Sequence, residues 1–265
     1  MIEVNQVAAA LESWAPLPLA ETYDNVGLLV GLPEQQTHGV LINLDMTEAV
    51  VEEAIELGLN MVVAHHPIWF GSRKRLNGED YVSRTIMKAV KHDIALYAIH
   101  TNLDNIRTGV NQKISDTLGL QETRFLQEKP ASSPDHPAGS GMVGTLAQPM
   151  EKQAFLQLVK ERFHCGGIRY ADGLTKAMVQ KVAVCGGAGS FLTKAAIQAE
   201  ADAFVTADIT YHKFFDHEHQ LLLMDIGHYE SEQFTSQLIH SYLSEKFPNF
   251  AVHLSKIRTN PIQYC

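Results

Sequence analysis

The chain has 265 residues, of which 45% are hydrophobic and 19% charged, a balance typical of a folded protein with one large or two modest domains. Its formal net charge of −9 has the wrong sign for a general nucleic-acid binder, because such a protein must neutralise phosphates. No apolar run approaches the about 20 residues that span a bilayer, and the N-terminus lacks the basic start of a secretory signal. We therefore expect no membrane span and no general binding to nucleic acid.

Three cysteines, Cys165, Cys185 and Cys265, are far apart in the chain and never form a Cys-X-X-Cys pattern. Their odd number and their spacing give no basis for a disulfide framework or a zinc–thiolate site. Free thiols suit a reducing compartment best, so a cytoplasmic location is expected.

The first half of the chain alternates between helix and strand patterns. Asn5 is expected to cap an N-terminal helix that stops before Pro16. The elements expected after it are a strand over 40–44, a helix opened at 47–48 and ended by Gly58, a strand over 59–64, a helix over 81–92, a strand over 94–99 and a helix over 109–118. This alternation predicts a parallel sheet with helices on both faces.

The second half repeats this rhythm after a stretch rich in Pro, Ser and Gly at 128–141, which is typical of a linker. It begins with a strand, a helix over 152–163 and another strand; further on, a strand, a Gly-rich turn, a helix and a strand fill 181–209. A strand over 221–226 and a helix over 231–246 follow. Setting Val40 against Val182 aligns the first strands of the two halves, although residue identity is poor. We predict an α/β fold of two related α/β/α units with mostly parallel sheets, covering residues 1–127 and 128–265.

Side chains able to bind metal follow the strands of this pattern. His65 and His66 come directly after the second strand, Asp104 follows the third, and His228 follows the strand over 221–226. Glu232 lies four residues after His228, so both face the same side of a helix. Functional groups in open α/β sheets gather outside the carboxyl ends of the strands, and imidazole and carboxylate are ligands of divalent metals. We therefore predict that these five side chains converge on one metal site.

Each of the five also has a simpler explanation. The paired histidines are consistent with a polar loop, Asp104 with a helix cap or a turn, and Glu232 with the favourable field at the start of a helix. His228 is consistent with a loop histidine whose hydrogen bonds are satisfied. Their occurrence at three separate strand ends favours the metal site over five independent explanations.

Other side chains are candidates to line the same cleft. Asp208 and His212 follow the strand of the second half that corresponds to the strand before His65, and a turn aspartate and a surface histidine are the alternative. Arg73 begins a basic stretch, 73–75, whose alternative is a solvated loop.

Two further segments have less specific patterns. Asp24 and Asn25 are interpreted as a turn leading into a strand. The loop CGGAGS (185–190) could present backbone N–H groups to a phosphate at a helix N-terminus, but turn flexibility explains its glycines equally well.

Several pieces of the chain resemble, in order, those of the Nif-three-like family, whose members are often described as GTP cyclohydrolase 1 type 2 homologues. The pieces are ETYDNVGLLVG (21–31), HHP (65–67), HTNLDN (100–105), TADITYH (206–212) and GHYESE (227–232). Together they span nearly the whole chain, and their combination is specific, whereas HHP by itself is a weak signal. One departure is that the family commonly has Thr-Gly-Asp where this chain has Thr206-Ala207-Asp208, which puts the backbone beside Asp208 in question.

The resemblance implies a Nif-three-like fold and a two-metal site. Its ligands would map onto His65, His66, Asp104, His228 and Glu232. It also implies a ring-like homohexamer. Some family members carry an extra domain in mid-chain, which this chain is expected to lack at its length.

Adjacent residues that leave a strand point in different directions, so His65 and His66 are expected to serve different ions. Glu232 or Asp104 is expected to bridge the two ions. Five ligands on two metals leave open positions, as in catalytic sites, and mixed imidazole and carboxylate suits zinc, iron, manganese or nickel. These features favour a metal-dependent hydrolase of a small anionic, nucleotide-like or phosphorylated substrate. The alternative is a non-catalytic, ring-shaped scaffold or regulatory interaction protein that the metal stabilises.

Overall fold

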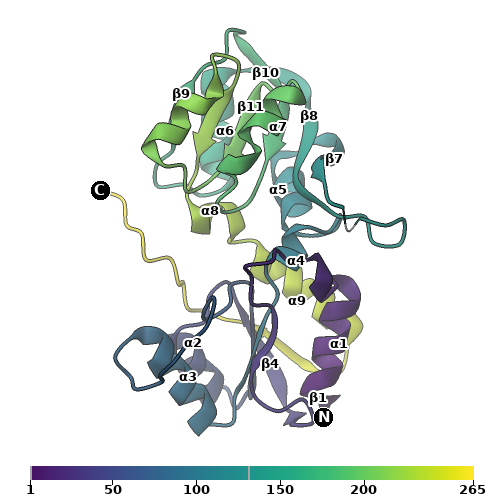
Figure 1. The fold of residues 1–265 in the computed structure, drawn as a ribbon, viewed down its shortest axis with the longest axis vertical. Coiled ribbons are helices and arrows are strands. Elements are labelled where there is room, and N and C mark those ends of the chain that lie inside the picture. The colour runs from purple at the N-terminus through teal and green to yellow at the C-terminus, as the bar shows by residue number, and fades with distance from the viewer. Residues whose placement is uncertain (1, 131) are drawn as a thin grey trace. The chain divides into compact units, whose positions relative to one another are not determined.

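The structure, a computed structural model, describes residues 2–130 and 132–265, which form two compact units (Figure 1). Unit 1 contains the residues up to Leu103 together with Thr235–Asn260, and unit 2 contains Asp104–Phe234 with Pro261–Cys265. These limits differ from the expected halves, 1–127 and 128–265. The difference arises because the chain returns to unit 1 near its end, and because residue 128 ends a strand inside unit 2.

Unit 1 contains a five-stranded sheet and a two-stranded ribbon, β1–β3. Its elements are β1 (Ile2–Glu3), α1 (Val4–Trp14), η1 (Leu17–Leu19), β2 (Gly27–Val30), β3 (Gln36–Thr37), β4 (Gly39–Asn43), α2 (Glu48–Glu56), β5 (Met61–Ala64), α3 (Tyr81–Lys91), β6 (Ala95–Ala98), α9 (Thr235–Lys246) and β13 (Ala251–Leu254). The sheet order is β13-β4-β5-β6-β2, and only β2 runs antiparallel to its neighbour. The predicted parallel sheet of the first half is therefore confirmed.

Local side-chain chemistry explains where the first helices begin. Helix α1 begins one residue after Glu3, whose backbone N–H donates to Gln6 Oε1 at 2.8 Å in a capping box. The expectation that Asn5 caps this helix was wrong, since Asn5 lies inside its first turn. Helix α2 begins as predicted, because the Thr47 hydroxyl oxygen accepts a hydrogen bond from the Val50 N–H at 3.4 Å.

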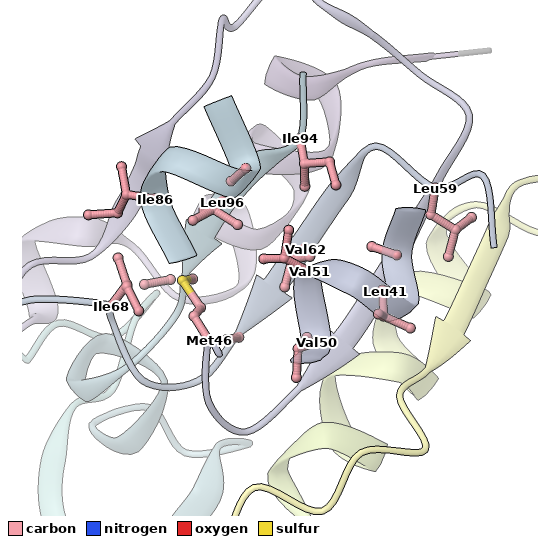
Figure 2. Packing of buried hydrophobic residues seen from close by; sticks show 14 of the residues in the cluster. Leu41, Met46, Val50, Val51, Leu59, Val62, Ile68, Ile86, Ile94 and Leu96 are labelled. Atoms are coloured by element: carbon pink, nitrogen blue, oxygen red, sulfur yellow. The ribbon is translucent and has the colours of Figure 1, made fainter. Parts of the chain in front are cut away.

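The central strands β4, β5 and β6 are buried on both faces, because every residue in them is buried and successive residues point to opposite sides. Leu41, Val62 and Leu96 pack with apolar residues of α2 and α3 on one face (Figure 2). On the opposite face, Tyr97 donates its hydroxyl proton to Glu12 of α1 at 3.3 Å. Helices therefore pack on both faces of the central strands.

Unit 2 contains a six-stranded sheet with the order β7-β8-β10-β11-β12-β9. Its elements are α5 (Val110–Leu118), β7 (Gln121–Glu128), β8 (Gly139–Glu151), α6 (Lys152–Arg162), β9 (Arg169–Asp172), β10 (Met178–Val184), η2 (Ser190–Leu192), α7 (Thr193–Gln198), β11 (Ala203–Thr206), η3 (Tyr211–His217), β12 (Leu222–Asp225) and α8 (His228–Glu232). The β10–β11 and β11–β12 pairs are parallel and the other pairs are antiparallel, so this sheet is mixed. Short helix α4 (Thr101–Asp104) precedes these elements, at the point where the chain leaves unit 1.

The stretch expected as a linker, 128–141, joins two strands of one hairpin. Glu128 of β7 pairs with Gly139 of β8, so both sides of the stretch belong to unit 2. Ala131, which falls within it, lies outside the described residues. The turn-rich composition was therefore that of a hairpin loop.

The two units share a strand topology. In unit 1 the parallel strands β4, β5 and β6 are followed at the sheet edge by antiparallel β2; in unit 2, β10, β11 and β12 are followed by antiparallel β9. Val40 pairs with Met61 in the first unit, and Val182 pairs with Ala203 in the second. The alignment of Val40 with Val182 thus matches equivalent strands. Among the residues that the structure describes, none of the helices is long and apolar enough to cross a membrane.

A buried carboxylate stabilises the amino end of the parallel strands in unit 2. Asp202 is 5% exposed and accepts hydrogen bonds from Lys176 Nζ at 2.8 Å and from the backbone N–H groups of Gln180 and Lys181 at 3.0 and 2.9 Å. Burial works to raise the pKa of Asp202, but these bonds, that of Lys176 foremost, hold it below its usual value. The stabilisation by this carboxylate is thus present above about pH 4 and lost as pH falls through the lowered pKa.

We expect Asp202→Asn to lower the free energy of unfolding by about 1–3 kcal/mol at pH 7, because the buried site loses a charge-assisted acceptor. The difference from the wild type should shrink as pH falls below about 4, where the wild-type carboxylate becomes protonated. Urea unfolding at a series of pH values measures both free energies. A difference that stays constant down to the acid end would contradict this role.

Candidate metal centre

Three histidines gather at the carboxyl ends of β5 and β6 in unit 1. His65 and His66 follow β5 directly, and His100 lies two residues after β6. The ring centroids are 4.9 Å apart for His65 and His66, 5.0 Å for His65 and His100, and 5.3 Å for His66 and His100. One ring nitrogen from each of the three lies within 4.8 Å of the other two. Three imidazoles at this spacing form a group that could hold a metal ion.

Two of these imidazoles are anchored through Nδ1. His65 donates its Nδ1 proton to the Ile99 carbonyl oxygen at 2.8 Å, and His66 donates to Asp45 Oδ1 at 2.7 Å. Because both partners can only accept, the proton is assigned to Nδ1 and the lone pair to Nε2. A histidine that ligates a metal commonly donates its other ring N–H to a carbonyl or carboxylate in this way. The anchoring therefore fits a metal ligand.

His100 is anchored in the same way, by a carboxylate from another part of the chain. Its Nδ1 donates to Asp24 Oδ1 at 2.9 Å, and Asp24 also accepts hydrogen bonds from the N–H and the hydroxyl of Thr101. Burial works to raise the pKa of Asp24, but His100 and Thr101 lower it to about 2, so the carboxylate is ionised. The interpretation of Asp24 as only a turn residue was incomplete.

A second group of donors lies in unit 2, at α8. Nε2 of His228 lies 3.1 Å from Glu232 Oε2, and its Nδ1 lies 2.7 Å from Asp208 Oδ2. An Asp104 carboxylate oxygen lies within 4.8 Å of one on Glu232. Attraction to Glu232, assisted by Asp208 and opposed by burial, raises the pKa of His228 to about 11. The carboxylates thus favour positive charge at this point, which fits a cation site.

The alanine that replaces the family's glycine meets no conformational barrier. Asp208 has the positive φ of this segment, 54°. Ala207 does not have a positive φ, so it needs no glycine-like backbone conformation. Ala207 is buried, and its N–H donates to the Gly187 carbonyl oxygen at 2.9 Å. Asp208 therefore reaches His228 with alanine before it.

The other two predicted cleft residues have different surroundings. His212 is exposed on η3, where its ring packs edge-on against Tyr211 with centroids 5.2 Å apart. Arg73 pairs with Asp80, the residue that caps α3, and donates to Ser83 Oγ at 3.1 Å. These contacts place Arg73 at the start of α3.

Three glycine N–H groups of the loop at 185–190 donate hydrogen bonds inside the protein. The Gly186 N–H donates to Asn111 Oδ1 at 3.0 Å, and the Gly187 N–H donates to Ser231 Oγ at 3.0 Å. The N–H of Gly189 donates to Thr206 Oγ1, also at 3.0 Å. These three N–H groups are used inside the protein and therefore do not support phosphate binding by this loop.

Gly187 instead leaves room for the donors of α8. A Cβ added at Gly187 would lie 2.5 Å from Glu232 Oε1 and 3.1 Å from His228 Cε1, and the residue has φ of 58°. A side chain here would displace both groups. Gly119 offers a matched position, since it has φ of 73° and no atom within 4 Å of an added Cβ.

We expect Gly187→Ala to weaken binding of divalent metal by about 10–100-fold, as the loss of a supporting group around a metal does. Gly119→Ala carries a similar backbone cost of about 1 kcal/mol without the clash, so it should leave metal affinity unchanged. Isothermal titration of metal-free protein with Zn²⁺ or Mn²⁺ compares the two variants. Equal affinities in both would contradict the assignment of Gly187 to the site.

A sequence profile of the family described as Duf34/NIF3 (NGG1p interacting factor 3) matches residues 2–261. The chain belongs to this family. NIF3-family relatives named GTP cyclohydrolase 1 type 2 homolog include one from Clostridium perfringens, 33% identical over 232 residues and 87% of each chain. Another, from Streptomyces coelicolor, is 33% identical over 269 residues, 98% of this chain and 94% of the relative.

Solved structures of NIF3-family proteins have the same fold. A Bacillus cereus protein related to NIF3 superimposes with a TM-score of 0.92 at 26% identity, covering 100% of this chain and 99% of its own. The Staphylococcus aureus protein SA1388 gives 0.90 at 29% identity, with the same coverage. The resemblance noted in the sequence is thus confirmed. A relative from Staphylococcus epidermidis aligns over 367 positions, more than the 265 residues of this chain, so it carries residues that this chain lacks.

Four residues of these groups were not predicted from the sequence. His100 and Asp45 follow β6 and β4 closely, so the rule that placed His65 at a strand end applies to them as well. Asp24 and Gly187 carry no local signal that separates them from ordinary turn residues. Only their contacts with His100 and with Glu232 identify them.

Proposed function

We propose that this NIF3-family protein binds two divalent metal ions and uses them to hydrolyse a small anionic substrate. The proposed ligands are His65, His66, Asp104, His228 and Glu232, with His100 as a further candidate. The observation that carries the proposal is the anchoring of the unit 1 imidazoles through Nδ1, which assigns each lone pair to Nε2, the atom that would bind a metal. These hydrogen bonds set the orientation and the tautomer of each imidazole in the absence of a metal.

The donor segments of the two units lie close together along the chain. His100 of unit 1 precedes Asp104 of unit 2 by four residues, and four extended residues span at most about 14 Å. Glu232 lies three residues before Thr235, where the chain returns to unit 1. Both donor segments of unit 2 are therefore tethered within a few residues of unit 1.

A pair of divalent ions supplies Lewis-acid activation of water and of an anionic substrate. The imidazoles are neutral ligands and the two carboxylates offset only half of the positive charge, so the ligand set favours an anionic substrate. The ligand set is also incomplete, which favours catalysis over a purely structural site. The name of the relatives makes GTP the first nucleotide to test. A phosphoester is also anionic, so it would equally offset the positive charge that the ligands leave on the ions.

The finer properties of the protein follow from the same proposal. Mixed imidazole and carboxylate ligands suit zinc, iron, manganese or nickel. The family resemblance supports a homohexamer, which light scattering would detect as six times the 29.4 kDa chain. The three cysteines are free thiols, in keeping with a cytoplasmic protein.

The proposal is tested by measuring bound metals and turnover in one preparation. Formate release from GTP and nitrophenol release from phosphomonoesters and phosphodiesters are compared between the wild type, His65→Ala and Glu232→Ala. We expect the wild type to turn over one of these substrates, and both variants to lose metal and turnover together. Turnover that persists without metal would refute the hydrolase. A chelator that lowers the melting temperature or alters assembly, with no turnover by the wild type, would favour the metal-stabilised scaffold.

A further inference from the structure

The last residues of the chain, Pro261–Cys265, belong to unit 2 and place an aromatic ring on a backbone surface without side chains. A Cβ added at Gly166 would lie 2.1 Å from Tyr264 Cδ2 and 2.4 Å from Cγ, and one added at Gly167 would lie 3.5 Å from Cδ1. Any residue larger than glycine at 166 would displace the ring. Gly166 and Gly167 therefore form a flat seat for Tyr264.

The hydroxyl end of Tyr264 reaches the start of α8. A Cβ added at Gly227 would lie 3.1 Å from the Tyr264 hydroxyl oxygen. Gly227 has φ of 94°, a conformation that favours glycine, and it directly precedes His228. Its carbonyl oxygen accepts a hydrogen bond from the Ser231 N–H at 3.0 Å. Tyr264 thus abuts the residue from which the helix bearing His228 begins.

The surroundings of the phenol keep it neutral. Burial raises the pKa of Tyr264, and the nearby Glu230 raises it further. The side chain is still 47% exposed on unit 2, so its removal opens no closed cavity in the core. Loss of Tyr264 should therefore act on the adjacent backbone rather than on the stability of the whole unit.

We propose that Tyr264 is a positioning residue for the metal ligands of α8, held on its glycine seat and bracing Gly227. The consequence for metal binding rests on the function proposed above, whereas the bracing itself does not. The ring carbons lie against Gly166, whereas the hydroxyl oxygen is the atom beside Gly227, so the bracing of Gly227 depends on the hydroxyl end of the side chain.

Hydrogen exchange in chelator-treated protein tests the bracing without metal. We expect the Ser231 amide, which donates to Gly227, to exchange about tenfold faster in Tyr264→Ala. Tyr264→Phe keeps the ring on Gly166 but removes the oxygen beside Gly227, so it should also exchange faster than the wild type, and Gln263→Ala, an exposed neighbour on the same segment, is the control. Unchanged exchange in Tyr264→Ala would overturn the proposal whether or not metal binds.

A double-mutant cycle separates bracing from an unrelated effect of either residue. Gly166→Ala alone should speed exchange as Tyr264→Ala does, and adding it to Tyr264→Ala should change nothing more. Additive effects of the two substitutions on the exchange rate would show that Tyr264 does not act through its contact with Gly166. Titration with Mn²⁺ should then show about tenfold weaker binding in Tyr264→Ala. If Tyr264→Ala shows faster amide exchange but an unchanged affinity for Mn²⁺, Tyr264 does not position the metal ligands of α8. If the wild type binds no metal, only the proposed function is refuted.

Discussion

Replacement of His65 by alanine is expected to weaken binding of divalent metal by at least about 100-fold, since the loss of a supporting group alone costs about 10–100-fold. His65 is fully buried, and its Nδ1 donates to the Ile99 carbonyl oxygen. Its ring lies beside the rings of His66 and His100. Removal of its imidazole leaves the group of three histidines one donor short. Metal content after dialysis and titration of metal-free protein both measure the loss.

The matched control is His38→Ala, because His38 is an exposed histidine of the same unit. The backbone N–H of His38 donates to Asn60 Oδ1 at 2.8 Å, a bond that the substitution keeps, so the metal content of the variant should equal that of the wild type. If His65→Ala keeps its metal, or if both variants lose it equally, the imidazoles of unit 1 are not the ligands.

Replacement of Phe204 by alanine is expected to lower the free energy of unfolding by about 3–5 kcal/mol. Phe204 lies on β11 with no exposed surface, in a cluster that includes Val143, Leu192 and Leu223. Its loss removes a large buried ring and leaves a cavity between the sheet and α7. Urea unfolding followed by circular dichroism measures the change.

Phe191→Ala serves as the control for this prediction. Phe191 precedes Leu192 on η2 and is 64% exposed, so its removal should change the free energy of unfolding by no more than about 0.5 kcal/mol. Similar losses in the two variants would show that the buried cluster around Phe204 does not stabilise unit 2 in this way.

The elements that the sequence predicted best are those with strong local patterns. Helix α3 (Tyr81–Lys91) buries Val82, Ile86 and Ala89 at helical spacing, and β5 (Met61–Ala64) is an unbroken apolar run. Strand β7 (Gln121–Glu128) was missed because most of it is polar and exposed, and its position is set by pairing with β8. Strand β13 was missed for a related reason, since it is short and only partly buried.

The return of the chain to unit 1 shows why the boundary of the units differed from the expectation. Composition marks turns well, but a hairpin loop and a linker share the same residues. Pairing decides between them, and the β13 strand pairs with β4, more than 200 residues earlier. No pattern within a short window contains that information.

By itself, the sequence determined the alternation of strands and helices, the α/β fold, and the placement of His65, His66 and His228 beyond strand ends. These follow from residue periodicity, which is local. Only the tertiary structure decided what anchors the imidazoles, why Gly187 must be glycine, and where Tyr264 lies. His100 meets Asp24 across 76 positions of chain, and His66 meets Asp45 across 21. Such contacts arise when distant segments pack together, because burial drives the packing while hydrogen bonds select the partners.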